Sequence, residues 1–406
     1  MKSISKSRKL DSVRYGSPAP ILARAHRMEL EGQRIIRLNV GDPAAFGFDP
    51  PEEVKLDMIH NLPGSAAISD SKGIFSARKA VMHYTQSQSI KGVTLDDIYL
   101  GDGASDLILM SMRAILDEGD EVLVPAPGCL LWDSAAILSG AVPVHYICDE
   151  ANGWTPDPHD IRRKVTPRTK GIVVINPNNP TGALYSDQLL EEIVAIAQES
   201  GLVVFADEVY DKVLFDGAKH TALASKSEDV LTLTFNSLTS SYRSGGYRAG
   251  WMFVSGNKTS ARDYIDGLNL LSSLRRCPNV PGQSAIQTAL GGHQSIADLV
   301  SVSGRLRRQR DLAHQLINAI PGVTCTKPQG ALYLFPRLDP EVYMIRDDQD
   351  FALQLLERHK VLVVPGTYCS WFRPDHFRIA FLPQESDLRE AIERIHKFLE
   401  HDLNRL

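Results

Sequence analysis

Short runs of apolar residues recur through the middle of the chain, and glycine, proline or polar residues follow each of them. Continuous apolar runs of this kind are typical of strands that are buried on both faces of a sheet. They occupy residues 97–103, 120–128, 142–148, 171–179, 202–210, 230–237 and 250–256. The pattern therefore predicts one large sheet in this part of the chain.

Helical patterns separate several of these runs, as at residues 105–119 and 186–201. The second pattern begins with Ser186, which suits a helix N-cap, and ends at Gly201, a usual residue after the last turn. Strands that alternate with helices predict an α/β fold with a doubly wound, mostly parallel sheet. Because ligands bind beyond the carboxyl ends of such strands, we expect the functional residues in the segments that follow them.

The last hundred residues have a different pattern, which predicts a smaller α+β unit. Helices are expected at 306–320, 350–360 and 385–403, two strands within 323–338, and single strands at 361–366 and 377–382. We expect three parts: an N-terminal arm and part of the small domain at 1–45, a large domain at 46–308 and a small domain at 309–406.

Composition narrows the class of protein. The 406 residues carry a formal net charge of −5, which argues against a nucleic-acid surface, and the 12 histidines show no metal-ligand spacing. The five cysteines are Cys129, Cys148, Cys277, Cys325 and Cys369. Their odd number and wide spacing favour reduced thiols. The N-terminus lacks the apolar run of a signal peptide, and no run is long enough for a membrane helix, so we expect a soluble cytoplasmic protein without a bound metal.

Two motifs follow neighbouring strands. NPNNPTG, from Asn176 to Gly182, forms a stiff turn that can direct an amide side chain into a crevice, although one Asn-Pro step alone would indicate only a loop. In FADEVYDKV, Asp207 ends the apolar run and Tyr210 follows three residues later. A carboxylate at this position can pair with a protonated ring nitrogen, and a tyrosine hydroxyl can bond to a ring oxygen. The same residues are also compatible with an acidic first turn of a helix.

A third motif, GDGASD, opens a helix after a strand. The backbone N–H groups of Ala104 and Ser105, with the Ser105 hydroxyl, can bind a phosphate at this helix N-terminus. Arg248, in GGYRAGW, can supply a permanent positive charge.

Together these segments resemble the class I/II aminotransferases of pyridoxal-phosphate fold type I. The resemblance extends from about Leu22 to the C-terminus. It is close to the bacterial alanine-forming glutamate–pyruvate transaminases, as the segments LNVGDPAAFGF, DSKGIFSARKA, TPRTKGIVVINPNNPTGA, NVPGQSAIQTALGG and PDHFRIAFLP illustrate. It implies a homodimer that acts on amino or oxo acids with pyridoxal phosphate or pyridoxamine phosphate as coenzyme.

The resemblance also implies roles for single residues. Asn179 and Tyr210 would bond the 3-oxygen of the coenzyme, and Asp207 would pair with its pyridine nitrogen. The phosphate would be held by Ala104, Ser105, Ser237 and Arg248. A substrate carboxylate would be bound by the Gly41 backbone, Asn179 and Arg378, because an arginine fork matches a carboxylate.

The chain departs from the family pattern at its most important position. The family motif SLSK, followed by a tyrosine and an arginine, here begins Ser237-Leu238-Thr239-Ser240, and the spacing to Arg248 is intact. Ser240 therefore stands where the family has the Schiff-base lysine. A serine cannot link the coenzyme covalently, and its hydroxyl is a weak base at neutral pH without a partner base. Loss of a positioned acid–base group typically lowers a rate by about 10²–10⁴.

Two further departures lie at Cys129 and Ile68. The family has a tyrosine at the first position that stacks on the coenzyme, and a tyrosine at the second that reaches the partner subunit's coenzyme phosphate. Three changes around one coenzyme favour natural divergence over a single engineered substitution. Decay of a dead enzyme would not be expected to spare Asp207, Arg248 and Arg378.

We therefore expect a diverged biosynthetic enzyme of amino acid metabolism that binds its coenzyme non-covalently. Its candidate catalytic residues are Ser240, Cys129 and Tyr210, although small-residue packing is an alternative explanation for Cys129. Three other readings stay open. In the first reading the protein is a coenzyme-independent enzyme that anchors an anionic substrate between Arg248 and Arg378. In the second it is a non-catalytic partner of an active homologue. In the third reading it is an alanine or glutamate transaminase with an engineered lysine-to-serine change at position 240.

Overall fold

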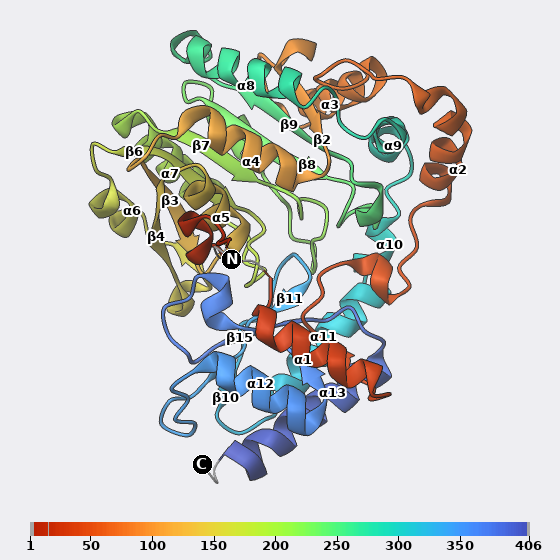
Figure 1. Ribbon diagram of the computed structural model, residues 1–406, viewed down its shortest axis with the longest axis vertical. Helices are drawn as coiled ribbons and strands as arrows, with labels where there is room; N and C mark the ends of the chain where they lie inside the picture. The colour runs from red at the N-terminus through yellow and green to blue at the C-terminus, as the bar shows by residue number, and fades with distance from the viewer. Residues whose placement is uncertain (1–3, 15, 404–406) are drawn as a thin grey trace.

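The computed structural model describes residues 4–14 and 16–403 of the chain. The helices are α1 (Ala19–Leu30), α2 (Glu52–Asn61), α3 (Phe75–Ser87), α4 (Ala104–Ile115), α5 (Leu130–Leu138), α6 (Pro158–Lys164), α7 (Asp187–Ser200), α8 (Arg262–Leu274), α9 (Val280–Gly291), α10 (Ile296–Val300), α11 (Arg305–Asn318), α12 (Asp348–His359) and α13 (Glu385–Lys397). Figure 1 shows the larger, sheet-containing part of the molecule above and the C-terminal part below.

The main sheet has the strand order β2-β9-β8-β7-β6-β3-β4-β5. Its strands are β2 (Ile98–Gly101), β3 (Glu121–Ala126), β4 (Val142–Asp149), β5 (Thr155–Pro156), β6 (Thr169–Ile175), β7 (Val203–Asp207), β8 (Thr232–Ser237) and β9 (Gly250–Ser255). The central pairs are parallel, and β2, β9 and β5 join antiparallel. The α/β class and the mostly parallel sheet predicted from the sequence are confirmed.

Successive side chains of the central strands point alternately to the two faces of the sheet, and each face has its own hydrophobic core. In β6, Ile172 and Val174 pack with α6 and α7, whereas Val173 and Ile175 pack with α4 and α5. Helices therefore cover both faces, which explains why the strands are continuous apolar runs.

The predicted ends of α7 are also confirmed. The Ser186 hydroxyl accepts a hydrogen bond from the Leu189 N–H, and Gly201 takes the left-handed conformation after the last turn.

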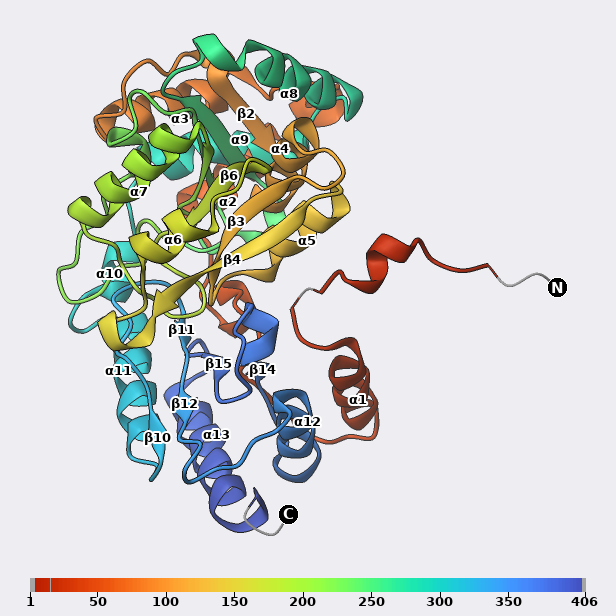
Figure 2. The same cartoon turned by 90° about the vertical axis from the view of Figure 1, so that its left-hand side faces the viewer.

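The C-terminal unit has its own core, to which the N-terminal segment contributes. Residues of α1 and β1 (Ile36–Arg37) pack with α11, α12 and α13, and β1 pairs in parallel with β13 (Val361–Leu362). Figure 2 shows α1 beside α12, with the preceding chain leading away from the body. The domain boundaries at 45 and 308 stay a prediction.

The short strands of this unit differ from the prediction. Residues 323–338 form three strands, β10 (Val323–Thr324), β11 (Tyr333–Leu334) and β12 (Arg337–Leu338), where two were expected. Residues 361–366 form β13 and β14 (Val364–Pro365) instead of one strand, because β13 pairs with β1 and β14 pairs with β15 (Phe377–Ala380). Partner choice divides one apolar run into two strands, and local sequence does not encode that choice.

Candidate active site

A cavity of about 390 Å³ lies at the carboxyl ends of β6, β7 and β8. Every residue predicted from the sequence to act within one subunit lines it: Gly41, Ala104, Ser105, Cys129, Asn179, Asp207, Tyr210, Ser237, Ser240, Arg248 and Arg378. These residues come from segments far apart in the chain. The parallel strands bring together the segments that follow β6, β7 and β8, whereas Gly41 and Arg378 come from outside this sheet. Their individual roles stay predictions.

Asp207 is the last residue of β7 and is buried. Its Oδ2 accepts a 2.9 Å hydrogen bond from Nε1 of Trp132, and Oδ1 accepts a longer bond from the Val209 N–H. Burial raises the pKa of Asp207 to about 6, although both hydrogen bonds favour the carboxylate. A cationic ring nitrogen beside this carboxylate would stabilise its charged form.

Glu208 and Tyr210 lie in a turn, so the alternative of a helix starting at Asp207 is not found. The hydroxyls of Tyr210 and Tyr333 share a hydrogen bond of 2.9 Å. Tyr333 also packs closely over Gly41, where an added Cβ would lie 1.9 Å from the Tyr333 hydroxyl oxygen. Only a glycine therefore leaves room for this tyrosine at the cavity wall.

Arg378, in β15, reaches the same cavity from the C-terminal unit. Its Nη1 donates to Oδ1 of Asn179 at 3.0 Å, and its Nη2 donates to the Asn39 carbonyl at 3.2 Å. Its guanidinium carbon lies 4.4 Å from the ring centre of Tyr333. Its Nε is buried and has no hydrogen-bond partner among the described residues. These contacts hold the side chain in place, and the Nε–H together with one N–H on each Nη remains for a ligand.

The start of α4 provides an anion site. The N-cap residue Gly103 has φ +82° and contributes no side-chain cap, so the first N–H groups of the helix have no such partner. Arg248 lies beside this terminus: its Nη2 donates to the Asp102 carbonyl at 2.8 Å and lies 3.4 Å from the Ser105 hydroxyl. A Cβ on Gly103 would come within 2.4 Å of the same Nη2.

Ser240 is 3% exposed and lies in the loop after β8. The adjacent Ser241 hydroxyl is buried without a hydrogen-bond partner among the described residues. Cys129 is the N-cap residue of α5 without a side-chain capping bond, and burial raises the pKa of its thiol to about 11. Ile68 is 65% exposed and is absent from the cavity lining, so its predicted place at a partner subunit's site stays a prediction.

Two important site residues were missed in the sequence. Trp132 follows Cys129 by three residues in α5, and its place under Asp207 depends on the packing of α5 against the sheet. Tyr333 lies in the C-terminal unit and joins Tyr210 only after the two units pack together. An aromatic residue in an apolar segment gives no local signal that separates such contacts from ordinary core packing.

No cluster of three or more potential metal ligands occurs among residues 4–14 and 16–403. All five cysteines are free. Within the same ranges, no helix is long and apolar enough to cross a membrane.

Comparisons with known proteins agree with this geometry. The family model described as aminotransferase class I and II matches residues 33–395. The chain is 52% identical to the glutamate-pyruvate aminotransferase AlaA of Escherichia coli strain K12 over 98% of both chains. It is 51% identical to an alanine aminotransferase of Mycobacterium tuberculosis, over 98% of this chain and 93% of that protein.

Solved structures show the same similarity. An aminotransferase from Escherichia coli has a TM-score of 0.98 at 51% identity, over 99% of this chain and 100% of that one. Alanine aminotransferase from Pyrococcus furiosus has a TM-score of 0.92 at 35% identity, over 98% of this chain and 100% of that one.

Proposed function

Because this chain belongs to the class I and II aminotransferase family, we propose that it binds pyridoxal phosphate or pyridoxamine phosphate non-covalently. It then acts on an amino or oxo acid without a Schiff-base lysine. The observation that carries this proposal is the side chain at position 240. Ser240 is buried and lines the same cavity as Asp207, Asn179 and both arginines.

The residues of the cavity fit such a coenzyme. The α4 N-terminus, with Arg248 beside it, is suited to a phosphate, and Ser237 lines the same cavity. Asp207 is a buried carboxylate that a protonated pyridine nitrogen would satisfy. Asn179 and Tyr210 would bond the ring oxygen. When bound, the coenzyme supplies an electron-withdrawing ring that stabilises negative charge on a substrate carbon.

Arg378 is the proposed anchor for the substrate carboxylate. Its two Nη groups already contact Asn179 and Asn39, which fixes the plane of the guanidinium, and its buried Nε has no partner among the described residues. A substrate carboxylate would accept charge-assisted hydrogen bonds from the Arg378 guanidinium. Because this side chain is already held in place, binding would cost little of its conformational freedom.

The three candidate proton carriers have protonated side chains at neutral pH. Burial raises the pKa of the Cys129 thiol to about 11 and holds the pKa of Tyr210 well above its usual value. Ser240 has no hydrogen-bonded base among the described residues that would activate its hydroxyl. These groups can donate a proton or a hydrogen bond, but none is poised to remove a proton from a substrate carbon.

Ordinary transamination is therefore expected to be slow. Reactions that break a carbon–carbon bond at the substrate carbon, such as decarboxylation, need no protein base to remove a proton from that carbon. The protein is proposed to be a diverged enzyme of amino acid biosynthesis that acts as a homodimer.

Absorption spectroscopy with added pyridoxal phosphate, followed by dialysis and intact-mass analysis, tests the proposal. We expect a coenzyme absorption band that is lost on extended dialysis, with no gain in protein mass after borohydride treatment. A borohydride-stable mass gain of one coenzyme per subunit, located to any single residue of the chain, would contradict non-covalent binding.

A coenzyme-independent enzyme is the second candidate, because Cys129 cannot stack on a ring as a tyrosine does. Calorimetry with pyridoxamine phosphate separates the two candidates. Saturable 1:1 binding that disappears in Arg248→Met supports the coenzyme site, whereas no binding supports an anionic substrate held by Arg248 and Arg378. If coenzyme binds but no amino or oxo acid is turned over, the protein is a non-catalytic partner.

A further inference from the structure

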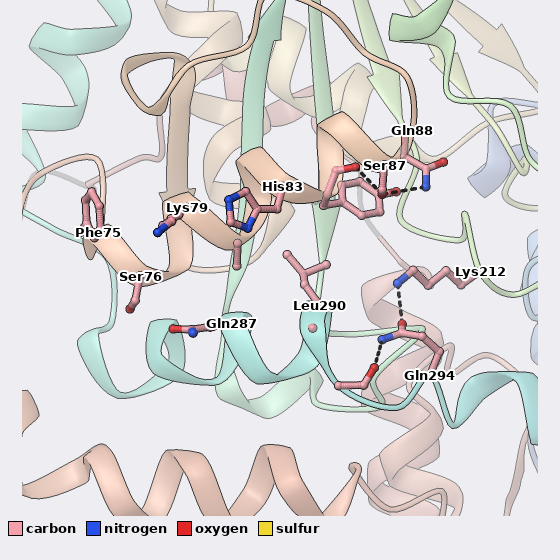
Figure 3. A pocket seen from close by; sticks show the side chains of 14 residues that line it. Phe75, Ser76, Lys79, His83, Ser87, Gln88, Lys212, Gln287, Leu290 and Gln294 are labelled. Carbon is pink, nitrogen blue, oxygen red and sulfur yellow. Dashed lines mark hydrogen bonds between the residues drawn. The ribbon is translucent and has the colours of Figure 1, made fainter.

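A second and larger cavity, of about 690 Å³, lies between α3 and α9 and is separate from the candidate active site. Ser76, Lys79 and His83 of α3 line it at spacings of three and four residues, which place them on one face of the helix. Figure 3 shows Lys79 and His83 side by side above Gln287 and Leu290 of α9.

Lys79 and His83 are exposed, and no hydrogen bond or ion pair to either side chain is present within the described parts of the chain. No carboxylate occurs among the described residues that line the cavity. Elsewhere on the surface, by contrast, lysines such as Lys55, Lys91 and Lys397 each contact a glutamate. Lys79 therefore brings to the cavity a positive charge that no described carboxylate contacts.

Lys212 enters the same cavity from the opposite side, as Figure 3 shows. Its Nζ donates to the Tyr242 hydroxyl at 2.7 Å and to Oε1 of Gln294 at 2.5 Å. An ammonium group has three N–H donors, so one is left for another acceptor. Burial lowers the pKa of Lys212, partly offset by Asp211, which accepts a hydrogen bond from Tyr84. An anion in the cavity would stabilise the charged lysine.

The walls also contain apolar surface, from Phe75, Ala80, Tyr84 and Leu290. Cavities of this size bind small molecules when apolar walls are combined with a few converging polar groups. We propose that this cavity binds a small molecule with an aromatic or other apolar part and one carboxylate or phosphate group. Its anionic group would lie against Lys79 and His83.

The position of the cavity makes it a suitable effector site. Lys212 follows Tyr210 by two residues, and Tyr242 follows Ser240 by two. The first segment contributes one residue to each cavity, and the second lines the candidate active site through Ser240 and contacts the second cavity through the Tyr242 bond to Lys212. A ligand that draws Lys212 away from Tyr242 would act on the loop that carries Ser240. The inference stands on the second cavity alone and does not depend on the proposed function.

Calorimetric titration with two probes, phenyl phosphate and phenylacetate, tests the site. Lys79→Glu reverses a charge on an exposed residue, so the variant should fold, as circular dichroism and the melting temperature would check. Lys219→Glu makes the same change in net charge at an exposed residue outside both cavities. We expect the affinity at one site to fall by at least about tenfold in Lys79→Glu, as for loss of a charged hydrogen bond, and to stay unchanged in Lys219→Glu.

Binding of either probe with this difference supports the site, and the tighter probe identifies the anionic group. His83→Gln provides a second variant, in which a smaller loss is expected. Equal binding by the wild-type protein, Lys79→Glu and His83→Gln would overturn the proposal, as would a crystal structure with the probe bound only between Arg248 and Arg378.

Discussion

The Trp132 indole donates a 2.9 Å hydrogen bond to the carboxylate of Asp207, and both side chains are buried. The tryptophan ring also packs edge-on against Phe235 of β8. Helix α5 therefore fixes the orientation of a carboxylate that lies at the end of a strand. The hydrogen bond stabilises the charged form of Asp207, which burial alone would disfavour.

Trp132→Phe tests this relationship. The variant keeps an aromatic ring but leaves the buried carboxylate with one donor fewer, so the affinity for pyridoxamine phosphate should fall roughly tenfold. Calorimetry measures the affinity, and thermal unfolding measures the accompanying loss of stability. Trp371→Phe is the matched control, because it removes a 3.0 Å bond to Asp375 in the C-terminal unit. It should lower stability without changing coenzyme affinity. An equal loss of affinity in both variants would mean that the effect is general destabilisation.

The two arginines are expected to separate coenzyme binding from substrate binding. Arg378→Lys removes the planar fork and should weaken binding of an amino or oxo acid by about 10- to 100-fold while coenzyme affinity changes little. Arg248→Lys should do the opposite, because Arg248 lies at the α4 N-terminus beside Ser105. Calorimetric titrations of both variants with pyridoxamine phosphate and with an oxo acid give the comparison. Parallel losses for both ligands in both variants would refute the separation.

Ser240→Lys should allow a covalent link to the coenzyme, visible as a mass gain after borohydride reduction. We expect its kcat/KM for alanine transamination to stay at least about tenfold below that of Ser240→Lys/Cys129→Tyr/Ile68→Tyr, because positioned groups act together in catalysis. Steady-state kinetics of the single and triple variants measures the difference. Full activity of the single variant would instead indicate an ordinary transaminase in which position 240 alone was altered.

Glu208 gives a pH dependence to stability. Its side chain is buried, accepts a 2.8 Å hydrogen bond from the Leu223 N–H and has a pKa raised by burial from 4.5 to about 8. The folded state thus binds a proton that the unfolded state releases near pH 4.5. Below about pH 4.5 the contribution of Glu208 to the free energy of unfolding does not change with pH. As the pH rises from about 4.5 to about 8, this contribution decreases. Glu208→Gln should remove the decrease between about pH 6 and pH 8 in urea unfolding experiments, above the pKa of Asp207. Glu199→Gln, at an exposed position, should retain it. A wild-type stability that rises across this range would contradict the assignment.

Much of the fold follows from local pattern. Residues 172–175 of β6 and 203–206 of β7 are apolar throughout because helices cover both of their faces, and the capping residues of α7 are explicit in the sequence. The short strands of the C-terminal unit were less predictable. Residues 361–366 form one apolar run in the sequence. In the structure the first part of this run, β13, pairs with β1, and the second part, β14, pairs with β15.

The sequence by itself determined which groups are available for chemistry. Asp207 and Asn179 follow parallel strands whose carboxyl ends meet at one edge of the sheet, Arg248 and Arg378 stand in sequence motifs, and Ser240 is read directly from the sequence. Tertiary structure decided how those groups are held. The Trp132 bond to Asp207, the Tyr333 bond to Tyr210 and the free Arg378 Nε depend on packing between elements distant in the chain. The charged cavity between α3 and α9 likewise arises only when two helix faces meet. Local sequence specifies side-chain type and periodicity, but long-range packing specifies distance, burial and therefore the pKa of each group.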